Sequence, residues 1–176
     1  MDIVVLAGGI STERDVSLSS GRMIYKAVKK LGHNAILLDV FLGYEGKDVE
    51  NIFESGEDWE AQATGIKETN PNLDEIKARR PDWKKNFFGP NVIAICQKAD
   101  VVFMDPPRAG SDEKFLSSVI KLGPKRVVYV SCNPETLARD LKYLTRHGYQ
   151  AVKIQPVDNF PFCDHIETVV KLVRKK

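Results

Sequence analysis

The sequence lacks the features that mark membrane proteins and disulfide-rich secreted proteins. No apolar run approaches the roughly 20 residues that a membrane-spanning helix requires. The N-terminus leads directly into a short apolar segment, without a basic region and signal core. The cysteines Cys96, Cys132 and Cys163 form no CxxC pair, which argues against a disulfide framework and a zinc site. We therefore expect a soluble, untargeted protein of the reducing cytoplasm, with no membrane contact and no metal.

The chain is also too short for two independent enzyme domains. Its 176 residues, 43% of them hydrophobic, suffice for one packed core, so we expect one domain over residues 1–176. The net charge of +2 hides an asymmetry, because residues 1–104 carry −3 and residues 105–176 carry +5. A mild basic excess is more typical of a solvated surface than of a nucleic-acid site, and by itself favours at most weak RNA binding.

Alternating strand and helix patterns predict an α/β fold. Short apolar runs indicate six strands, at residues 2–7, 35–40, 101–104, 126–130, 151–157 and 166–173. Apolar residues at helical spacing predict the main helices at about residues 16–31, 91–98, 112–122 and 134–147. Asn91 is expected to cap the second of these helices. The region from residue 41 to 90 is irregular, with short helices expected at 49–53 and 73–80. An aromatic cover over the sheet is expected from Trp59, Trp83, Phe87 and Phe88.

The first strand is followed by a glycine pair and the start of a helix. Such a turn exposes backbone N–H groups that hold anions in many α/β proteins. Spacing alone favours the simpler interpretation, a tight turn between Gly8-Gly9 and a capped helix.

The segments LAGGISTERDVSLSSG, GHNAILLDV and FFGPNVIAICQKADVVFM together resemble the N-terminal domain of D-alanine–D-alanine ligase, over about residues 1–104. The resemblance implies that Glu13 helps to hold the ammonium of the first D-alanine, and that Val16 and Ser17 shape the same pocket. The ligase family continues with domains that carry ATP, magnesium and the second amino acid. Here DPPR follows the third strand instead, so we expect no ligation, no ATP site and no magnesium site.

The motifs DPPR, SCNP and HIET occur between about Val101 and Lys176. In this order and spacing they resemble the end of the catalytic domain of S-adenosylmethionine-dependent RNA 5-methyluridine methyltransferases. In that family a thiolate adds to uracil C6, the resulting enolate takes the methyl group, and a base then removes the C5 proton. The resemblance implies that Cys132 is the nucleophile, Glu167 the general base and Asp105 a polar anchor.

Further residues of these motifs have supporting roles in the same resemblance. Pro106 and Pro107 stiffen the floor of the site beside Arg108, and Asn133 and Pro134 orient the nucleophile loop. His165 lies next to the base position. The segment Phe162-Cys163-Asp164 departs from the small or polar residues that are usual in the family.

The methyl donor's usual binding elements are not recognisable. Proteins of this kind bind it at a glycine-rich loop after the first strand and at an acidic residue after the second strand. AGGISTERD and Asp39 occupy those places, and we interpret Asp39 as a chance strand ending. We therefore expect an incomplete S-adenosylmethionine site and no cofactor.

Both resemblances imply the same winding of the sheet. We predict one doubly wound, Rossmann-like open sheet in the order 2-1-3-4-6-5, with only the last strand antiparallel. Our main hypothesis is an engineered or recombined chimera, joined within residues 99–105, with no turnover and no expected partner, as a monomer or weak homodimer. The alternatives are an RNA (uracil-5-)methyltransferase with a cysteine nucleophile, or a module that binds RNA or an anion weakly.

Overall fold

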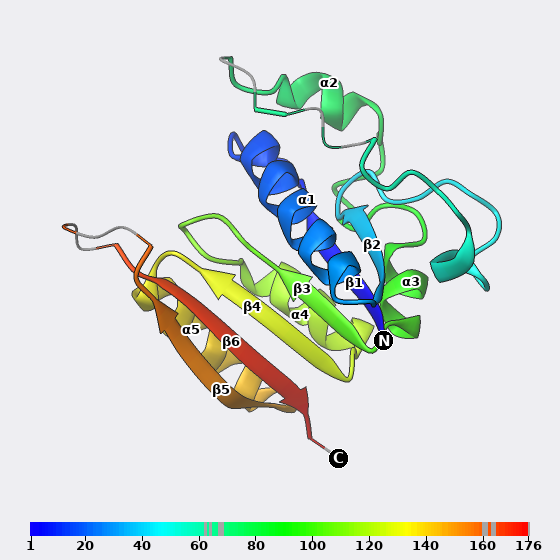
Figure 1. Cartoon of the computed structure of the whole chain (residues 1–176). Coiled ribbons are helices and arrows are strands. Elements are labelled where there is room, and N and C mark those ends of the chain that lie inside the picture. The colour runs from blue at the N-terminus through cyan, green and yellow to red at the C-terminus, as the bar shows by residue number, and fades with distance from the viewer. Residues whose placement is uncertain (62, 64, 67–68, 160–161, 163–164, 176) are drawn as a thin grey trace.

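The computed structural model describes the chain except for residues 62, 64, 67–68, 160–161, 163–164 and 176. Six strands form one uninterrupted sheet in the order β2-β1-β3-β4-β6-β5 (Figure 1). The strands are β1 (Asp2–Ala7), β2 (Asn34–Asp39), β3 (Val101–Met104), β4 (Arg126–Ser131), β5 (Tyr149–Val157) and β6 (Glu167–Arg174). Neighbours among β1 to β4 pair in parallel, whereas β6 pairs antiparallel with β4 and β5. The predicted strand order and the antiparallel last strand are confirmed.

Helices cover the two faces of the sheet unequally. They are α1 (Arg14–Lys30), the short 3-10 helix η1 (Ile52–Glu54), α2 (Leu73–Ala78), α3 (Val92–Lys98), α4 (Glu113–Leu122) and α5 (Pro134–Arg146). In Figure 1, α1 lies in front of the sheet beside β1 and β2, while α4 and α5 lie behind it. On the α1 side, no helix of the described residues covers β3, β4 and β6. None of the described helices is long and apolar enough to span a membrane.

Burial along the strands follows this unequal cover. All but the first residue of β1 and of β2 is buried, because both faces of these strands are packed. In β4 the burial alternates, with Val127 and Tyr129 fully buried and Val128 and Val130 only half-buried. One face of β4, with Val127 and Tyr129, is thus packed in the core, whereas the other face, with Val128 and Val130, is apolar and partly open to solvent.

Local signals explain where the helices beside the site begin and end. The Asp112 side chain accepts a hydrogen bond from Phe115 N at the start of α4, and Gly123 ends that helix in the left-handed region. Asn133 caps α5 by accepting from Glu135 N and Thr136 N. These caps fix the two loops that follow β3 and β4.

Asn91 stands at the N-cap position of α3, as predicted, but its side chain does not cap the helix. Asn91 adopts a left-handed φ of 59° and makes no side-chain cap to α3. Its Nδ2 instead donates to the carbonyl oxygens of Tyr44 and Gly46, and these bonds connect the irregular region to the start of α3.

An arginine organises the irregular region from residue 41 to 90. Arg80 is buried and donates hydrogen bonds to four carbonyl oxygens, those of Phe41, Asn86, Phe87 and Phe88. Trp59 and Phe88 are buried in the core beneath, which confirms for them the predicted aromatic cover. The region is therefore held against the edge of the sheet near β2.

Candidate functional site

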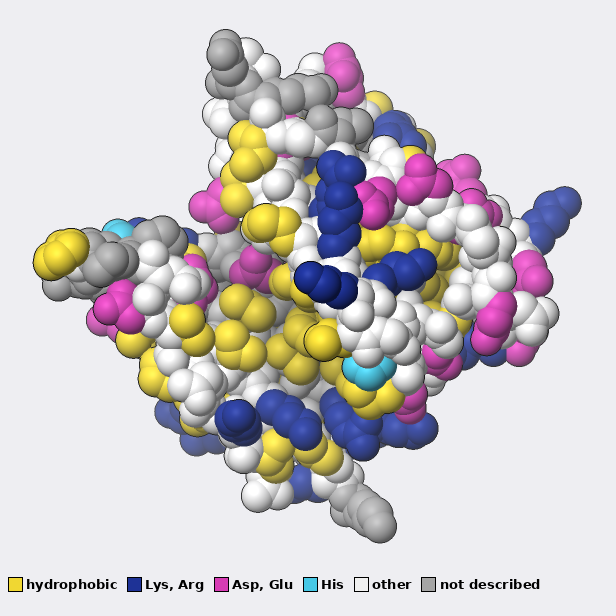
Figure 2. Space-filling model, viewed as in Figure 1, with side chains coloured by type: hydrophobic (Ala, Val, Ile, Leu, Met, Phe, Trp, Pro, Cys, Tyr) yellow, Lys and Arg dark blue, Asp and Glu magenta, His cyan; other side chains and the backbone are white. Residues whose placement is uncertain are grey.

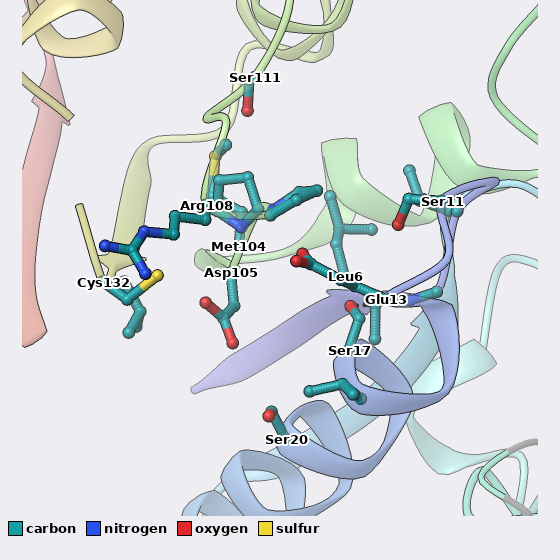
Figure 3. A pocket seen from close by; sticks show the side chains of 18 of the residues that line it. Leu6, Ser11, Glu13, Ser17, Ser20, Met104, Asp105, Arg108, Ser111 and Cys132 are labelled. Carbon is teal, nitrogen blue, oxygen red and sulfur yellow. Dashed lines mark hydrogen bonds between the residues drawn. The ribbon is translucent and has the colours of Figure 1, made fainter. Parts of the chain in front are cut away.

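A cavity of about 970 Å³ opens at the carboxyl ends of β1, β3 and β4, and ligand pockets are typically about 300–1,000 Å³. Open α/β sheets place their binding sites at this edge. The side chains that line it come from the turn after β1, from α1, from the loops after β3 and β4, and from the start of β6 (Figure 3). One cavity is thus built from both the N-terminal and the C-terminal part of the chain.

The cavity brings together residues that the sequence assigned to two different sites. It is lined by Glu13, Val16 and Ser17 of the ligase-like segment and by Asp105, Pro106, Arg108, Cys132 and Glu167 of the methyltransferase-like segment. Asn133 and Pro134 are not among its lining residues, and they begin α5 directly behind Cys132. Arg108 Nη2 lies 3.3 Å from His165 Nδ1 and links the loop after β3 to the approach to β6.

Negative charge predominates in the cavity. Among the described lining residues, Arg108 is the one cation, against the carboxylates of Glu13, Asp105, Asp112 and Glu167. Burial raises the pKa of Asp105 to about 6, and the negative charges of Glu167 and Glu13 add to that rise. The electrostatics of the cavity therefore favour a ligand with positive charge. No group of three or more His, Cys, Asp or Glu side chains in the described part of the chain is arranged to hold a metal ion.

Cys132 stands one residue beyond β4 and contributes to the cavity wall. Burial raises the pKa of its thiol, the charges of Glu167 and Asp105 raise it further, and Arg108 opposes them. Cys96 is fully buried in the core, where burial alone raises its pKa to about 12. Of these two thiols, only Cys132 is placed to react, and it needs a proton acceptor to do so.

Asp39 is engaged inside the protein. It is fully buried, its oxygens accept hydrogen bonds from Phe41 N and Leu42 N, and it forms an ion pair with buried Arg14. Arg14 also donates to Gly9 O at 2.6 Å. The carboxylate is thus paired inside the protein, and it does not line the cavity.

The glycine turn is shaped by this pair. A Cβ on Gly8 would lie 2.9 Å from the carboxyl group of Asp39, and Gly8 adopts a φ of +81°. Gly8 N donates to Ser17 Oγ at 3.1 Å. These contacts support the interpretation of a tight structural turn and leave Gly8 N–H committed to Ser17.

A second buried carboxylate, which the sequence analysis missed, holds the loop after β3. Asp140 of α5 is fully buried and accepts from Ser111 N at 2.7 Å and from Tyr129 Oη at 2.6 Å. Its neighbour Arg139 donates to the carbonyl oxygens of Ala109 and Ser111, each at 3.0 Å. A signal was present, because Asp140 falls between Leu137 and Leu144 on the apolar face of α5.

Comparison with known proteins identifies one family. The sequence model of a family described as tRNA (uracil-5-)-methyltransferase matches residues 85–175. An uncharacterized RNA methyltransferase of Listeria innocua is 45% identical over 129 residues, covering 72% of this chain and 26% of that protein. One of Enterococcus faecalis is 36% identical over 162 residues, covering 86% of this chain and 35% of that protein.

A solved structure agrees with these matches. The tRNA (uracil-54, C5)-methyltransferase of Pyrococcus abyssi, in complex with S-adenosyl-L-homocysteine, superposes with a TM-score of 0.51 at 26% identity. The match covers 97% of this chain and 34% of that one. The chain thus spans about a quarter to a third of the length of these three relatives.

These findings overturn our main hypothesis. A match over 86% of the chain extends far into residues 1–104, so the interpretation as a ligase–methyltransferase chimera, engineered or recombined, is wrong. The expectations of no enzyme and no cofactor are wrong as well, because the family is one of methyltransferases and a relative's structure holds S-adenosyl-L-homocysteine. The error arose because each motif was assigned to a family by itself, whereas the matches to one family run across the supposed junction at residues 99–105.

Proposed function

The chain belongs to the tRNA (uracil-5-)-methyltransferase family, and we propose that it carries the methyl-transfer site of an S-adenosylmethionine-dependent RNA (uracil-5-)methyltransferase. The observation that carries this proposal is the placement of Cys132, Glu167 and Asp105 around one cavity, at the edge of the sheet where β1, β3 and β4 end. A nucleophile, a base and an anchor are what methylation of a poorly nucleophilic ring carbon requires.

Cys132 supplies the nucleophile in this scheme. Its Sγ forms a bond to C6 of the uracil, and the electron pair of the C5–C6 double bond moves toward C5 and O4. Because burial and then the charges of the surrounding carboxylates raise the pKa of the Cys132 thiol, its proton must first pass to an acceptor on the cavity wall. When bound, the cofactor supplies an electrophilic methyl group.

Glu167 completes the cycle as the base. It begins β6, where the antiparallel pairing with β4 sets Thr168 opposite Ser131 and so holds Glu167 near Cys132. Removal of the C5 proton by Glu167 restores the C5–C6 double bond and expels the Cys132 thiolate. The base and the nucleophile therefore lie on adjacent strands whose register fixes their separation.

The residues present fit parts of the cofactor well. The cavity is large enough for a nucleoside, its walls include apolar Ile10, Phe87 and Phe115, and its excess of carboxylates suits a sulfonium cation. The ribose has no carboxylate at the end of β2, because Asp39 is engaged with Arg14. Binding must therefore depend on the apolar walls and on the carboxylates of the cavity.

The RNA substrate is expected to approach over the open side of the sheet. Figure 2 shows hydrophobic side chains gathered in the middle of this face and Lys and Arg side chains along its lower margin. A second groove of about 440 Å³ contains Arg126 and Lys171 beside apolar Phe103 and Val128. Cationic side chains at such a margin attract the phosphate backbone without reading its sequence.

The experiment that tests this function is adduct formation with RNA that contains 5-fluorouracil, in the presence of S-adenosylmethionine. Fluorine at C5 cannot be removed as a proton, so the Cys132–C6 bond persists and the complex survives denaturing gel electrophoresis. We expect an adduct with the wild type and with Cys163→Ser, and none with Cys132→Ser. Glu167→Gln retains the adduct but loses release of tritium from [5-³H]uracil RNA. A wild-type protein that forms no adduct and transfers no methyl group refutes the proposal.

A further inference from the structure

The cavity has no carboxylate at the end of β2 to bind the ribose of a cofactor, because Asp39 does not line it. In open α/β sheets a carboxylate after the second strand holds the ribose of a nucleoside. Here Asp39 is 0% exposed and Arg14 is 5% exposed, and the two are paired with each other inside the protein. Affinity and specificity for a nucleoside cofactor must come from other side chains.

Glu13 is the carboxylate of the N-terminal part that does reach the cavity. It directly precedes Arg14 at the start of α1. The Glu13 side chain extends into the ligand space, whereas the Arg14 side chain points inward to Asp39. Figure 3 shows Glu13 and Asp105 extending into the same space, from α1 and from the loop after β3. The Glu13 side chain is exposed on the cavity wall, so no core packing depends on it.

The charge of Glu13 acts on Asp105 within this cavity. After burial and the charge of Glu167, the negative charge of Glu13 adds to the rise in the pKa of Asp105. Both carboxylates line the same cavity, so a ligand cation there interacts with the two together.

We propose that Glu13 is a specificity-determining residue for the positive charge of the methyl donor. With Asp105 it forms an anionic wall that favours the sulfonium of S-adenosylmethionine over the neutral thioether of S-adenosylhomocysteine. The inference rests on the proposed function. Methyl transfer converts the sulfonium cation into a neutral thioether, so the carboxylates bind the product S-adenosylhomocysteine more weakly than the substrate. Charge selection by Glu13 therefore assists product release.

Electrostatics set the size of the effect. Glu13 is exposed to solvent, so its attraction for a charge a few ångströms away is screened toward the weak end of the range for protein surfaces. We expect S-adenosylmethionine to bind about fivefold more tightly than S-adenosylhomocysteine, and this ratio to fall when the Glu13 charge is removed, to the value that the remaining carboxylates support.

The test is titration calorimetry of both ligands with four proteins. These are the wild type, Glu13→Gln, the charge-retaining Glu13→Asp, and Glu75→Gln, which removes an exposed charge on distant α2. We expect Glu13→Gln to reduce the preference for the sulfonium, and Glu13→Asp and Glu75→Gln to keep it in full. Circular dichroism of each variant checks that the fold is unchanged.

The outcomes separate this inference from the function on which it rests. If both ligands bind the wild type equally, or if Glu13→Gln keeps the preference, the role of Glu13 is refuted and the methyltransferase function stands. If neither ligand binds and no RNA adduct forms, both proposals fail. A larger loss of affinity for the neutral thioether than for the sulfonium in Glu13→Gln would also overturn the inference.

Discussion

Replacing Asp105 with Asn should make the protein more stable at neutral pH. Burial, and then the negative charges of Glu167 and Glu13, raise the pKa of Asp105 from 3.8 to about 6 in the folded protein. In the unfolded chain the carboxyl group is solvated and remote from both charges. As the pH rises from about 4 to about 6, the unfolded chain therefore releases this proton before the folded protein does. The stabilisation that protonated Asp105 gives the folded protein is therefore full below about pH 4 and is lost as the pH rises to about 6.

The magnitude follows from the size of the shift. A change of about two pKa units corresponds to about 3 kcal/mol, at about 1.4 kcal/mol for each unit. Partial exposure of Asp105 lets solvent screen part of this cost, so we expect about 2 kcal/mol. The Asn side chain has nearly the same shape and carries no charge. The variant should therefore exceed the wild type by about 2 kcal/mol above about pH 7, and should match it near about pH 3.5.

Urea unfolding followed by circular dichroism, at several pH values between those limits, measures this difference directly. Asp82→Asn is the matched control, because Asp82 is exposed and surface substitutions of this kind usually change stability by less than about 0.5 kcal/mol. A difference between Asp105→Asn and the wild type that does not change with pH would show that packing, and not charge, is responsible. Equal stability above about pH 7 would refute the reasoning.

The remaining predictions concern the thiol, the buried network and a helix cap. Glu167→Gln removes a charge that raises the pKa of Cys132, so alkylation of Cys132 by iodoacetamide near neutral pH should be about threefold faster by peptide mass spectrometry. Asp140→Ala should cost about 3–5 kcal/mol of unfolding free energy and Tyr129→Phe about 1.5–3 kcal/mol. The double variant should cost less than their sum in urea unfolding, because both remove one interaction. Asn133→Ala should cost about 1 kcal/mol, through loss of the α5 cap, in the same assay.

Hydrophobic period predicted the strands well because each buried strand is a short apolar run with a turn after it. The segments at residues 2–7 and 35–40 match β1 and β2 to within a residue. β5 begins at Tyr149, two residues earlier than predicted, because Tyr149 is buried and its hydroxyl donates to Pro124 O. Past that point β5 is almost wholly exposed, so no alternation of polar and apolar residues marked its start.

The site was predicted residue by residue but not as one site. Cys132, Glu167 and Asp105 were identified from motifs, and Glu13 from another motif that assigned it to a different enzyme. Only the sheet order, which sets β1 beside β3 and β3 beside β4, brings all four to one cavity. That order was predicted correctly, so the error lay in assigning the motifs to two enzymes before asking which of them the order brings to the same edge of the sheet.

The buried ion pair and the buried carboxylate were missed for a related reason. Charged residues are almost never fully buried unless they are paired, so Asp39 looked like a chance strand ending and Arg14 was not singled out. Their pairing joins positions 25 residues apart, and the contact of Tyr129 with Asp140 joins β4 to α5. The burial of each charged residue can be predicted only when its partner is known.

These two buried networks explain how the protein holds like charges close together. The pair of Arg14 with Asp39 fixes the start of α1, which carries Glu13, and Asp140 fixes the loop after β3, which carries Asp105. Rigid supports keep the two carboxylates from moving apart, so their repulsion persists in the folded protein and contributes to the raised pKa of Asp105. A ligand cation would relieve that repulsion, and this is the basis of the charge selection proposed for Glu13. Glu13→Gln relieves the same repulsion, so Glu13→Gln and Asp105→Asn should stabilise the protein by less together than the sum of their separate effects, measured by urea unfolding above about pH 7. Full additivity would mean that the two carboxylates do not interact, and it would remove the basis for charge selection by Glu13.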